Sequence, residues 1–266
     1  WARQAIYYLC NFGSDADPFK HMNAALNFNE EMYATLASLG FTVVFAAVSL
    51  FAGGASDKYD RSKVVALSCF GWSTCTALQS LAGGYSDLLP LRALLGFFQA
   101  FFNPAAYTLL SDVFPQRMIG TVNGIFSGGV YLGGALASLS ILLDNAYGWR
   151  STVYMIGLIG FGAAALNLLL IRDPLRGAKA LRMKPATVEA VEGLIGADKE
   201  VKNGSMIEES LLALKEVTAT KEARLLFTAT AFRFCAGFSI AIWKAPFIFS
   251  KFPGVAEQFS SSNAAI

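Results

Sequence analysis

Charged side chains are scarce in this sequence: Asp, Glu, Lys and Arg make up 15% of its 266 residues, whereas hydrophobic residues make up 55%. A soluble globular domain normally carries about 25% charged residues. The net charge is only +2, and no stripe of Lys or Arg interleaves with aromatic residues, which argues against binding to nucleic acid. The composition points instead to a protein of the lipid bilayer.

Catalytic and metal-binding patterns are also missing from the sequence. His21 is the single histidine, and the four cysteines lack the close spacing that a zinc site or a redox dithiol requires. The sequence contains no HExxH, GxSxG or GxxxxGK[ST] motif. We therefore expect no catalytic residue, no metal and no cofactor, and we interpret the cysteines as small apolar packing residues.

Long uncharged runs are abundant instead. A bilayer core of about 30 Å requires about 20 apolar residues in a helix, because every backbone polar group must be paired within the segment. Five runs predict such spans, at residues 32–56, 64–86, 93–111, 119–143 and 151–171. The predicted fold class is all-α, as a polytopic membrane protein.

The two ends of the sequence are less regular. Residues 225–250 are long enough to span, although Arg233 and Lys244 interrupt the run. The apolar run at 5–14 is short and lies close to a first residue that is Trp, so we expect a first helix truncated by the start of the sequence. The final residues resemble a loop that enters another helix, which predicts a fragment of a larger protein.

The distribution of cations predicts orientation and domains. The turn at 57–63 carries Lys58, Arg61 and Lys63, and by the positive-inside rule this turn is cytoplasmic. Residues 173–222 are dense in charges of both signs and predict a cytoplasmic linker with an amphipathic helix at 205–217. The predicted domains are an N-terminal six-helix bundle at 1–172, the linker at 173–222 and the start of a second bundle at 223–266.

Polar residues recur on one face of the run that begins near residue 92. Steps of seven, four and four residues separate Arg92, Gln99, Asn103 and Tyr107, so these side chains share one face of a helix. We expect this face to line a wet cavity that binds substrate; in the alternative, Arg92 only extends to the membrane surface. Arg233, eleven residues before Lys244, predicts a further cation at the cavity, favouring an anionic substrate.

The turn "GGASDKYDRSK" at 53–63 resembles the loop between helices two and three of the major facilitator superfamily. The resemblance implies that Gly53, Asp57 and Arg61 belong to a latch that joins the two halves of a carrier on the cytoplasmic side, with Asp112 as the partner acid. Asp60 departs from the family pattern, which prefers glycine there. A solvated loop that only follows the positive-inside tendency is the alternative.

Further motifs resemble the spinster family within that superfamily. These are "RALLGFFQA" at 92–100, where Gln99 replaces the acid of the family pattern, the "DVFP" turn at 112–115 and "YGWR" at 147–150. In "NFGSDADPFK" the family would place a coupling acid, which suggests Asp15 or Asp17; equally, both belong to an outer loop.

The resemblance implies a secondary carrier that works by alternating access between two bundles. Its substrate would be lipid-like or a small organic anion, and its energy source an ion or substrate gradient. The expected partners are that substrate, a coupling ion and the lipid bilayer. Two rival interpretations are a seven-helix receptor, which should start outside the cell, and a membrane-embedded enzyme, which would need a catalytic dyad within the spans.

Overall fold

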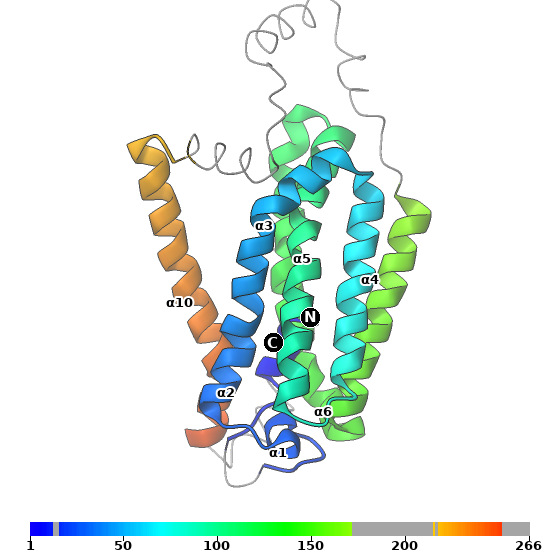
Figure 1. Cartoon of the computed structure of the whole chain (residues 1–266), viewed down its shortest axis with the longest axis vertical. Helices are drawn as coiled ribbons and strands as arrows, with labels where there is room; N and C mark the ends of the chain where they lie inside the picture. Colours follow the sequence, from blue (N-terminus) through cyan, green and yellow to red (C-terminus); the bar gives the residue numbers. More distant parts are fainter. Residues whose placement is uncertain (13–15, 172–214, 216–217, 252–266) are drawn as a thin grey trace, which may run out of the picture.

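A computed structural model of the chain describes residues 1–12, 16–171, 215 and 218–251, and within these ranges no residue belongs to a β-strand. Long helices run side by side and form one elongated bundle (Figure 1). The all-α fold class is therefore confirmed. The predicted linker at 173–222 and its amphipathic helix lie almost wholly outside the described residues, so that domain division stays a prediction.

The first long helical segment runs from residue 30 to residue 58 in three parts. It consists of α2 (Glu30–Ala34), a π-helical turn η2 (Thr35–Leu39) and α3 (Gly40–Lys58). The Asn29 side chain accepts a hydrogen bond from the Met32 amide and so begins the helix. The predicted span at 32–56 is thus a helix, with a π-turn that the hydropathy could not reveal.

A two-residue turn leads from α3 into α4 (Arg61–Gln79). Asp60 stands at the start of α4, where its Oδ1 accepts a hydrogen bond from the Lys63 amide at 3.1 Å. The acid that departs from the family pattern therefore acts as a helix cap. We call the end of the bundle that carries this turn the inner end, as the charge pattern predicts, and the opposite end the outer end.

The next turn differs from the predicted one. Residues 80–84 connect α4 to α5 (Tyr85–Val113), so α5 includes the segment 87–92 that was predicted as a loop. The uncharged run at 64–86 continued across the real turn because residues 80–86 hold no charge, whereas Asp87 and Arg92 lie inside the helix. Boundaries set by charge alone are wrong here by seven or eight residues.

The last two spans of the first bundle meet at a glycine. Residues 119–170 are helical (α6, Ile119–Leu170), preceded by a 3₁₀ turn η3 (Gln116–Met118), but Gly148 breaks α6 with φ 77° and ψ 160°. The two arms of α6 run in opposite directions from this break (Figure 1). They correspond to the predicted spans at 119–143 and 151–171.

The N-terminal residues do not continue as the predicted truncated helix. Only Ala5–Tyr7 form a short 3₁₀ turn, η1, and a short helix α1 (Met22–Leu26) follows. The expectation of a helix at 5–14 is therefore wrong in the described structure. Near the other end, α10 (Lys221–Lys251) contains the predicted span at 225–250, with Pro246 inside it.

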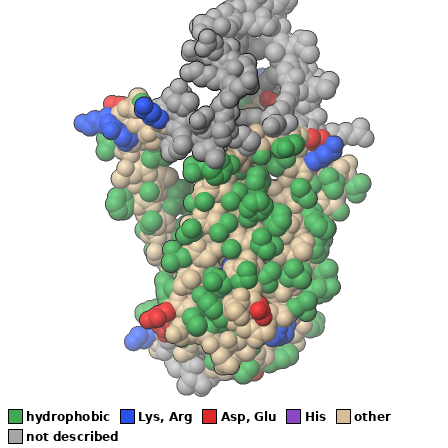
Figure 2. All heavy atoms as spheres, viewed as in Figure 1, with side chains coloured by type: hydrophobic (Ala, Val, Ile, Leu, Met, Phe, Trp, Pro, Cys, Tyr) green, Lys and Arg blue, Asp and Glu red, His purple; other side chains and the backbone are tan. Residues whose placement is uncertain are grey.

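Four of the described helical segments are long and apolar enough to cross a membrane: Glu30–Ser56, Tyr85–Val113, Gln116–Leu170 and Lys221–Lys244. Hydrophobic side chains cover the wall of the bundle, and charged side chains gather toward its two ends (Figure 2). This two-ended distribution of charge is what a bilayer imposes on a helical bundle.

Small residues allow the helices to approach closely. An added Cβ at Gly96 of α5 would lie 2.6 Å from the Phe41 carbonyl oxygen of α3. An added Cβ at Gly157, on the second arm of α6, would lie 2.8 Å from the Ala77 Cβ of α4. The packing of α5 on α3 and of α4 on the second arm of α6 thus depends on glycine, as in other membrane bundles.

The backbone at Gly148 gives a first testable prediction. Its dihedral angles lie in a region open almost only to glycine, and a Cβ there would lie 2.9 Å from the Phe19 carbonyl oxygen. Gly148→Ala should therefore lower the free energy of unfolding by about 2 kcal/mol, measured as the unfolding midpoint in mild detergent. Gly162→Ala, in the same helix with open space around its Cβ, is the matched control and should unfold at the parent midpoint.

Candidate functional site

The polar face predicted on α5 is divided in the structure between a buried end and an open end. Arg92 is 2% exposed, Gln99 is half-buried, and Asn103 is exposed. Tyr107 is 38% exposed, and its hydroxyl lies 3.1 Å from the Ser127 Oγ of the first arm of α6. Gln99, Asn103 and Tyr107 therefore form an accessible polar stripe, whereas Arg92 does not belong to it.

Arg92 is covered by the N-terminal residues. Its guanidinium donates a hydrogen bond to the Arg3 carbonyl oxygen at 3.1 Å, and its Nε has no hydrogen-bond partner among the described residues. Neither of the two sequence interpretations, an open cavity or a side chain that extends to the membrane surface, describes this buried position. Arg92 is instead a buried positive charge near the outer end of the stripe.

Arg3 connects the first bundle to α10. Its guanidinium lies between two aromatic rings, 4.3 Å from the Phe41 centroid on α3 and 4.5 Å from the Phe238 centroid on α10. A cation between two ring faces is attracted by both. The adjacent Trp1 Nε1 donates to the Ser140 Oγ at 2.7 Å, so the N-terminal residues join three helices.

A second contact of α10 lies at the same outer end. The Tyr33 hydroxyl of α2 donates to the Ile242 carbonyl oxygen at 2.8 Å, and the Tyr33 ring meets the Trp243 ring edge-on at 5.6 Å between centroids. Tyr33 itself is fully buried. The outer end of α10 is thus bound to the first bundle by Arg3 and Tyr33.

The inner half of α10 makes no comparable contact with the described residues. From residue 221 to residue 236 its side chains are exposed or half-exposed, and in Figure 1 the helix leans away from α3 at its inner end. Among the described residues, α10 therefore meets the other helices at the outer end and is separated from them at the inner end.

Arg233 is not brought to the polar stripe. It precedes Ile242, which faces the first bundle, by nine residues, or two and a half turns of helix, so it lies on the opposite face of α10. Arg224 precedes Ile242 by eighteen residues, five full turns, and so shares its face. Arg224 is therefore a cation of α10 on the face that bears Ile242, and the sequence analysis missed it.

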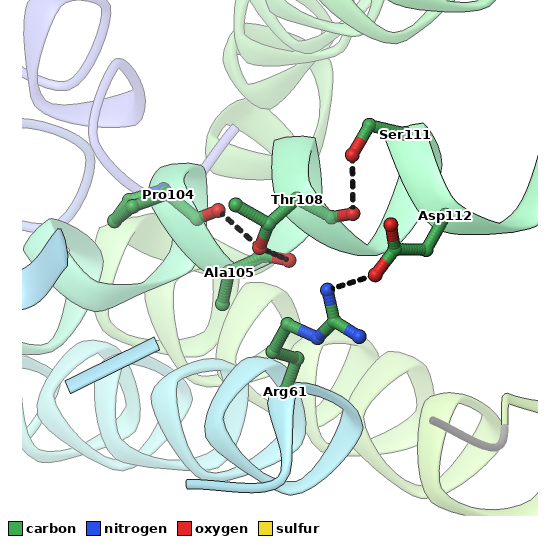
Figure 3. A network of polar contacts seen from close by, with 6 residues as sticks. All are labelled: Arg61, Pro104, Ala105, Thr108, Ser111 and Asp112. Atoms are coloured by element: carbon green, nitrogen blue, oxygen red, sulfur yellow. Dashed lines mark hydrogen bonds and ion pairs between the residues drawn. The ribbon is translucent and has the colours of Figure 1, made fainter. Parts of the chain in front are cut away.

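At the inner end the structure pairs two of the predicted latch residues. Arg61 at the start of α4 forms an ion pair with Asp112 at the end of α5, with 2.5 Å between Nη1 and Oδ2 (Figure 3). The Arg61 side chain is 7% exposed and that of Asp112 35%. This pair joins two helices of one bundle, so any contact with the other half must come from another group.

Nearby hydroxyl groups are directed to the backbone rather than to this ion pair. The Thr108 hydroxyl donates to the carbonyl oxygens of Pro104 and Ala105, and the Ser111 hydroxyl to that of Thr108 (Figure 3). These are the local bonds from a hydroxyl group to the preceding turn that Thr and Ser side chains commonly make within a helix.

Two of the predicted latch residues remain to be placed, Asp57 and Gly53. The backbone of Asp57 belongs to α3, but its side chain lies outside the described residues. A Cβ added at Gly53 would meet nothing within 4 Å. Among the described residues, no other helix therefore approaches closely at Gly53.

Of the two acids suggested for ion coupling, the structure describes Asp17, which lies near the outer end. Asp15 lies outside the described residues, and Asp17 is exposed in a turn where its Oδ1 accepts a hydrogen bond from the Phe19 amide. Its position favours the outer-loop alternative. In the same segment, burial lowers the pKa of His21 below its ordinary value.

Among the described residues, no group of three or more His, Cys, Asp or Glu side chains is placed to hold a metal ion. Four membrane-length helical segments, an accessible polar stripe and charged side chains that gather toward the two ends define an integral, multi-pass membrane protein.

A family model described as "Major Facilitator Superfamily" matches residues 14–264 of the chain. The chain therefore belongs to this superfamily. The family resemblance seen in the sequence is thereby confirmed.

Similar proteins include two that are named as transporters and one named protein spinster. The chain is 32% identical over 163 residues to the probable galactarate/D-glucarate transporter GarP of Escherichia coli K12, covering 54% of this chain and 35% of GarP. It is 29% identical over 208 residues to the multidrug transporter FLU1 of Candida albicans, covering 73% of this chain and 32% of FLU1. It is 29% identical over 146 residues to protein spinster of Drosophila melanogaster, covering 54% of this chain and 24% of spinster.

A solved structure shares the fold. It is a bacterial homologue of the human lysosomal transporter spinster in an inward-facing, unoccupied conformation, with a TM-score of 0.71 at 19% identity, covering 99% of this chain and 56% of that one. The chain spans about a third or less of the length of GarP, FLU1 and protein spinster.

The ion pair at the inner end gives a second prediction. Asp112→Asn should lower the free energy of unfolding by about 2–3 kcal/mol, because it removes the negative charge that the buried Arg61 guanidinium meets at Asp112 Oδ2. Asp60→Asn is the control: it breaks the exposed pair with Lys63 but keeps the cap, and its effect should stay below about 1 kcal/mol. Equal unfolding midpoints for the two variants in mild detergent would contradict a stabilising role for the pair.

Proposed function

We propose that the protein is a secondary carrier that moves a small organic anion across a membrane by alternating access. One observation carries the proposal: α10 meets the first bundle only at the outer end among the described residues, through Arg3 and Tyr33. Such a contact closes the outer side and leaves the polar stripe open to the inner side. This is the inward-facing member of the pair of states that alternating access requires.

The chemistry of the stripe supports an anionic substrate with hydroxyl groups. Gln99, Asn103 and Tyr107 offer both donors and acceptors. Arg92 and Arg3 lie beyond the outer end of the stripe and make its electrostatic potential positive. Relatives named as transporters of galactarate and D-glucarate, of sulfoacetate and of D-galactonate agree with this class. The spinster relatives make a lipid-like anion the competing substrate.

The inner side would close when α10 swings toward the first bundle. Arg224 lies near the inner end of α10 on the face that bears Ile242, and Asp57 lies at the inner end of α3. In this proposal Arg224 and Asp57 form the latch of the outward-facing state, while the Arg61–Asp112 pair holds the turn in place. The driving force is a gradient of substrate or of a coupling ion.

The outer contact gives a third prediction. Tyr33→Phe removes the hydrogen bond to Ile242 but keeps the ring, and should raise the outward-to-inward ratio by about fivefold, the equivalent of one hydrogen bond. Accessibility of a cysteine placed at the outer end to an impermeant reagent would measure the ratio. Tyr131→Phe, at an exposed tyrosine of α6, is the control.

The inner latch should act in the opposite direction in the same assay. Asp57→Asn removes an acid that would stabilise only the outward-facing state, so the outward-facing fraction should fall. If both substitutions changed the ratio in one direction, or neither did, alternating access about these two contacts would be refuted.

The polar stripe gives a fourth prediction. Asn103→Ala should weaken binding of the organic anion by about tenfold, since a hydrogen bond to a charged group is lost, and KM for uptake into proteoliposomes would report it. Gln116→Ala, an exposed side chain outside the stripe, should leave KM unchanged. Uptake of lysolipids but not of sugar acids would contradict the small organic anion proposed here and favour a lipid-like substrate.

A further inference from the structure

Two open grooves flank the inner half of α4. One, of about 560 Å³, lies between α4, the end of α3 and the middle of α5, and Tyr59, Val64 and Phe98 contribute to its walls. The other, of about 670 Å³, lies between α4 and the second arm of α6, where Phe70 and Phe161 face it. Both volumes are within the range of about 300–1,000 Å³ that is typical of ligand sites.

Lys63 and Leu67 line both grooves. Leu67 is 67% exposed and forms a ridge between the grooves, and Lys63 lies one turn of helix nearer to the inner end. The two grooves are therefore branches of one surface feature, with a single lysine where they meet.

The grooves have the depth of one leaflet. From Lys63 to Phe70 the helix rises by about 10 Å, within the half-thickness of about 15 Å of a bilayer core. Apart from Lys63 and Asp60, their walls are made mainly of aromatic and aliphatic side chains, on a bundle whose wall is apolar (Figure 2). Hydrocarbon is the chemistry that fits these branches.

Lys63 is available to an anion from outside the protein. Its side chain is 78% exposed, and its Nζ lies 3.4 Å from the Asp60 Oδ2. An exposed pair of this kind contributes little, and the Asp60 Oδ1 is in any case bonded to the Lys63 amide. A phosphate group could thus replace the Asp60 carboxylate at Lys63 without loss of the helix cap.

We propose that an anionic two-chain phospholipid of the inner leaflet binds astride α4, with one acyl chain in each groove and its phosphate at Lys63. A two-chain lipid matches two branches that share one cation, whereas a single-chain lipid fills only one branch. Anionic headgroups are attracted to lysines at the cytoplasmic surface. The site lies on the lipid-facing wall, so it is independent of the transport cycle proposed above.

Native mass spectrometry of the purified protein, exchanged against lipids of known headgroup, tests this site. The probes are dioleoyl phosphatidylglycerol, dioleoyl phosphatidylcholine and single-chain lysophosphatidylglycerol. Phosphatidylglycerol should bind with one high-occupancy adduct, and Lys63→Gln should weaken it about fivefold, as expected for one lysine at an anionic surface. Lys221→Gln, an exposed lysine at the inner end of α10 that lines neither groove, should leave it unchanged.

Two further variants separate the headgroup from the chains. Asp60→Asn keeps the cap but removes the competing acid, so it should strengthen phosphatidylglycerol binding. Ala165→Trp fills the α4–α6 groove and should lower binding of phosphatidylglycerol to the level of the single-chain lipid. Equal binding of phosphatidylcholine and phosphatidylglycerol to the parent, or an unchanged adduct in Lys63→Gln, would overturn the proposal.

Discussion

A charge that leaves water must keep a partner, and this constraint decides where the ionic groups of the bundle lie. Arg61 is buried where the Asp112 carboxylate meets its guanidinium. Arg3 lies between two aromatic rings, and Arg92 has a backbone carbonyl group. The remaining charges stay near the two ends (Figure 2). Each partner belongs to a different helix or segment, so the pairing of charges also fixes which helices are neighbours.

Much of the fold could be predicted because hydrocarbon selects long uncharged helices, and a helix lies at each predicted span, although α4 is not among the described segments that are long and apolar enough to cross a membrane. The boundaries did not follow, since the turn at 80–84 holds no charge and α5 includes Asp87 and Arg92. The π-turn at Thr35–Leu39 and the break at Gly148 depend on backbone geometry. A hydropathy pattern contains no information about either.

Some residues of the candidate site could be predicted from the sequence, and others could not, because only some of the contacts are local. The helical period placed Gln99, Asn103 and Tyr107 together, since it is a local property of one helix. The contact of Arg61 with Asp112 matched the family resemblance. The burial of Arg92 under Arg3 and the bond from Tyr33 to Ile242 join residues 89 and 209 positions apart, and only folding brings such residues together. The position of Arg233, opposite to Ile242, required the facing side of α10 to be known.

The attachment of α10 at one end makes it a lever. Its fulcrum is the cluster of Arg3, Phe238 and Tyr33, and about 27 Å of helix separates Ile242 from Arg224. A tilt of about 10° at the fulcrum would carry the far tip by about 5 Å over this length of helix. Side chains near the fulcrum therefore set the stiffness of the motion, whereas those at the tip determine how far it travels.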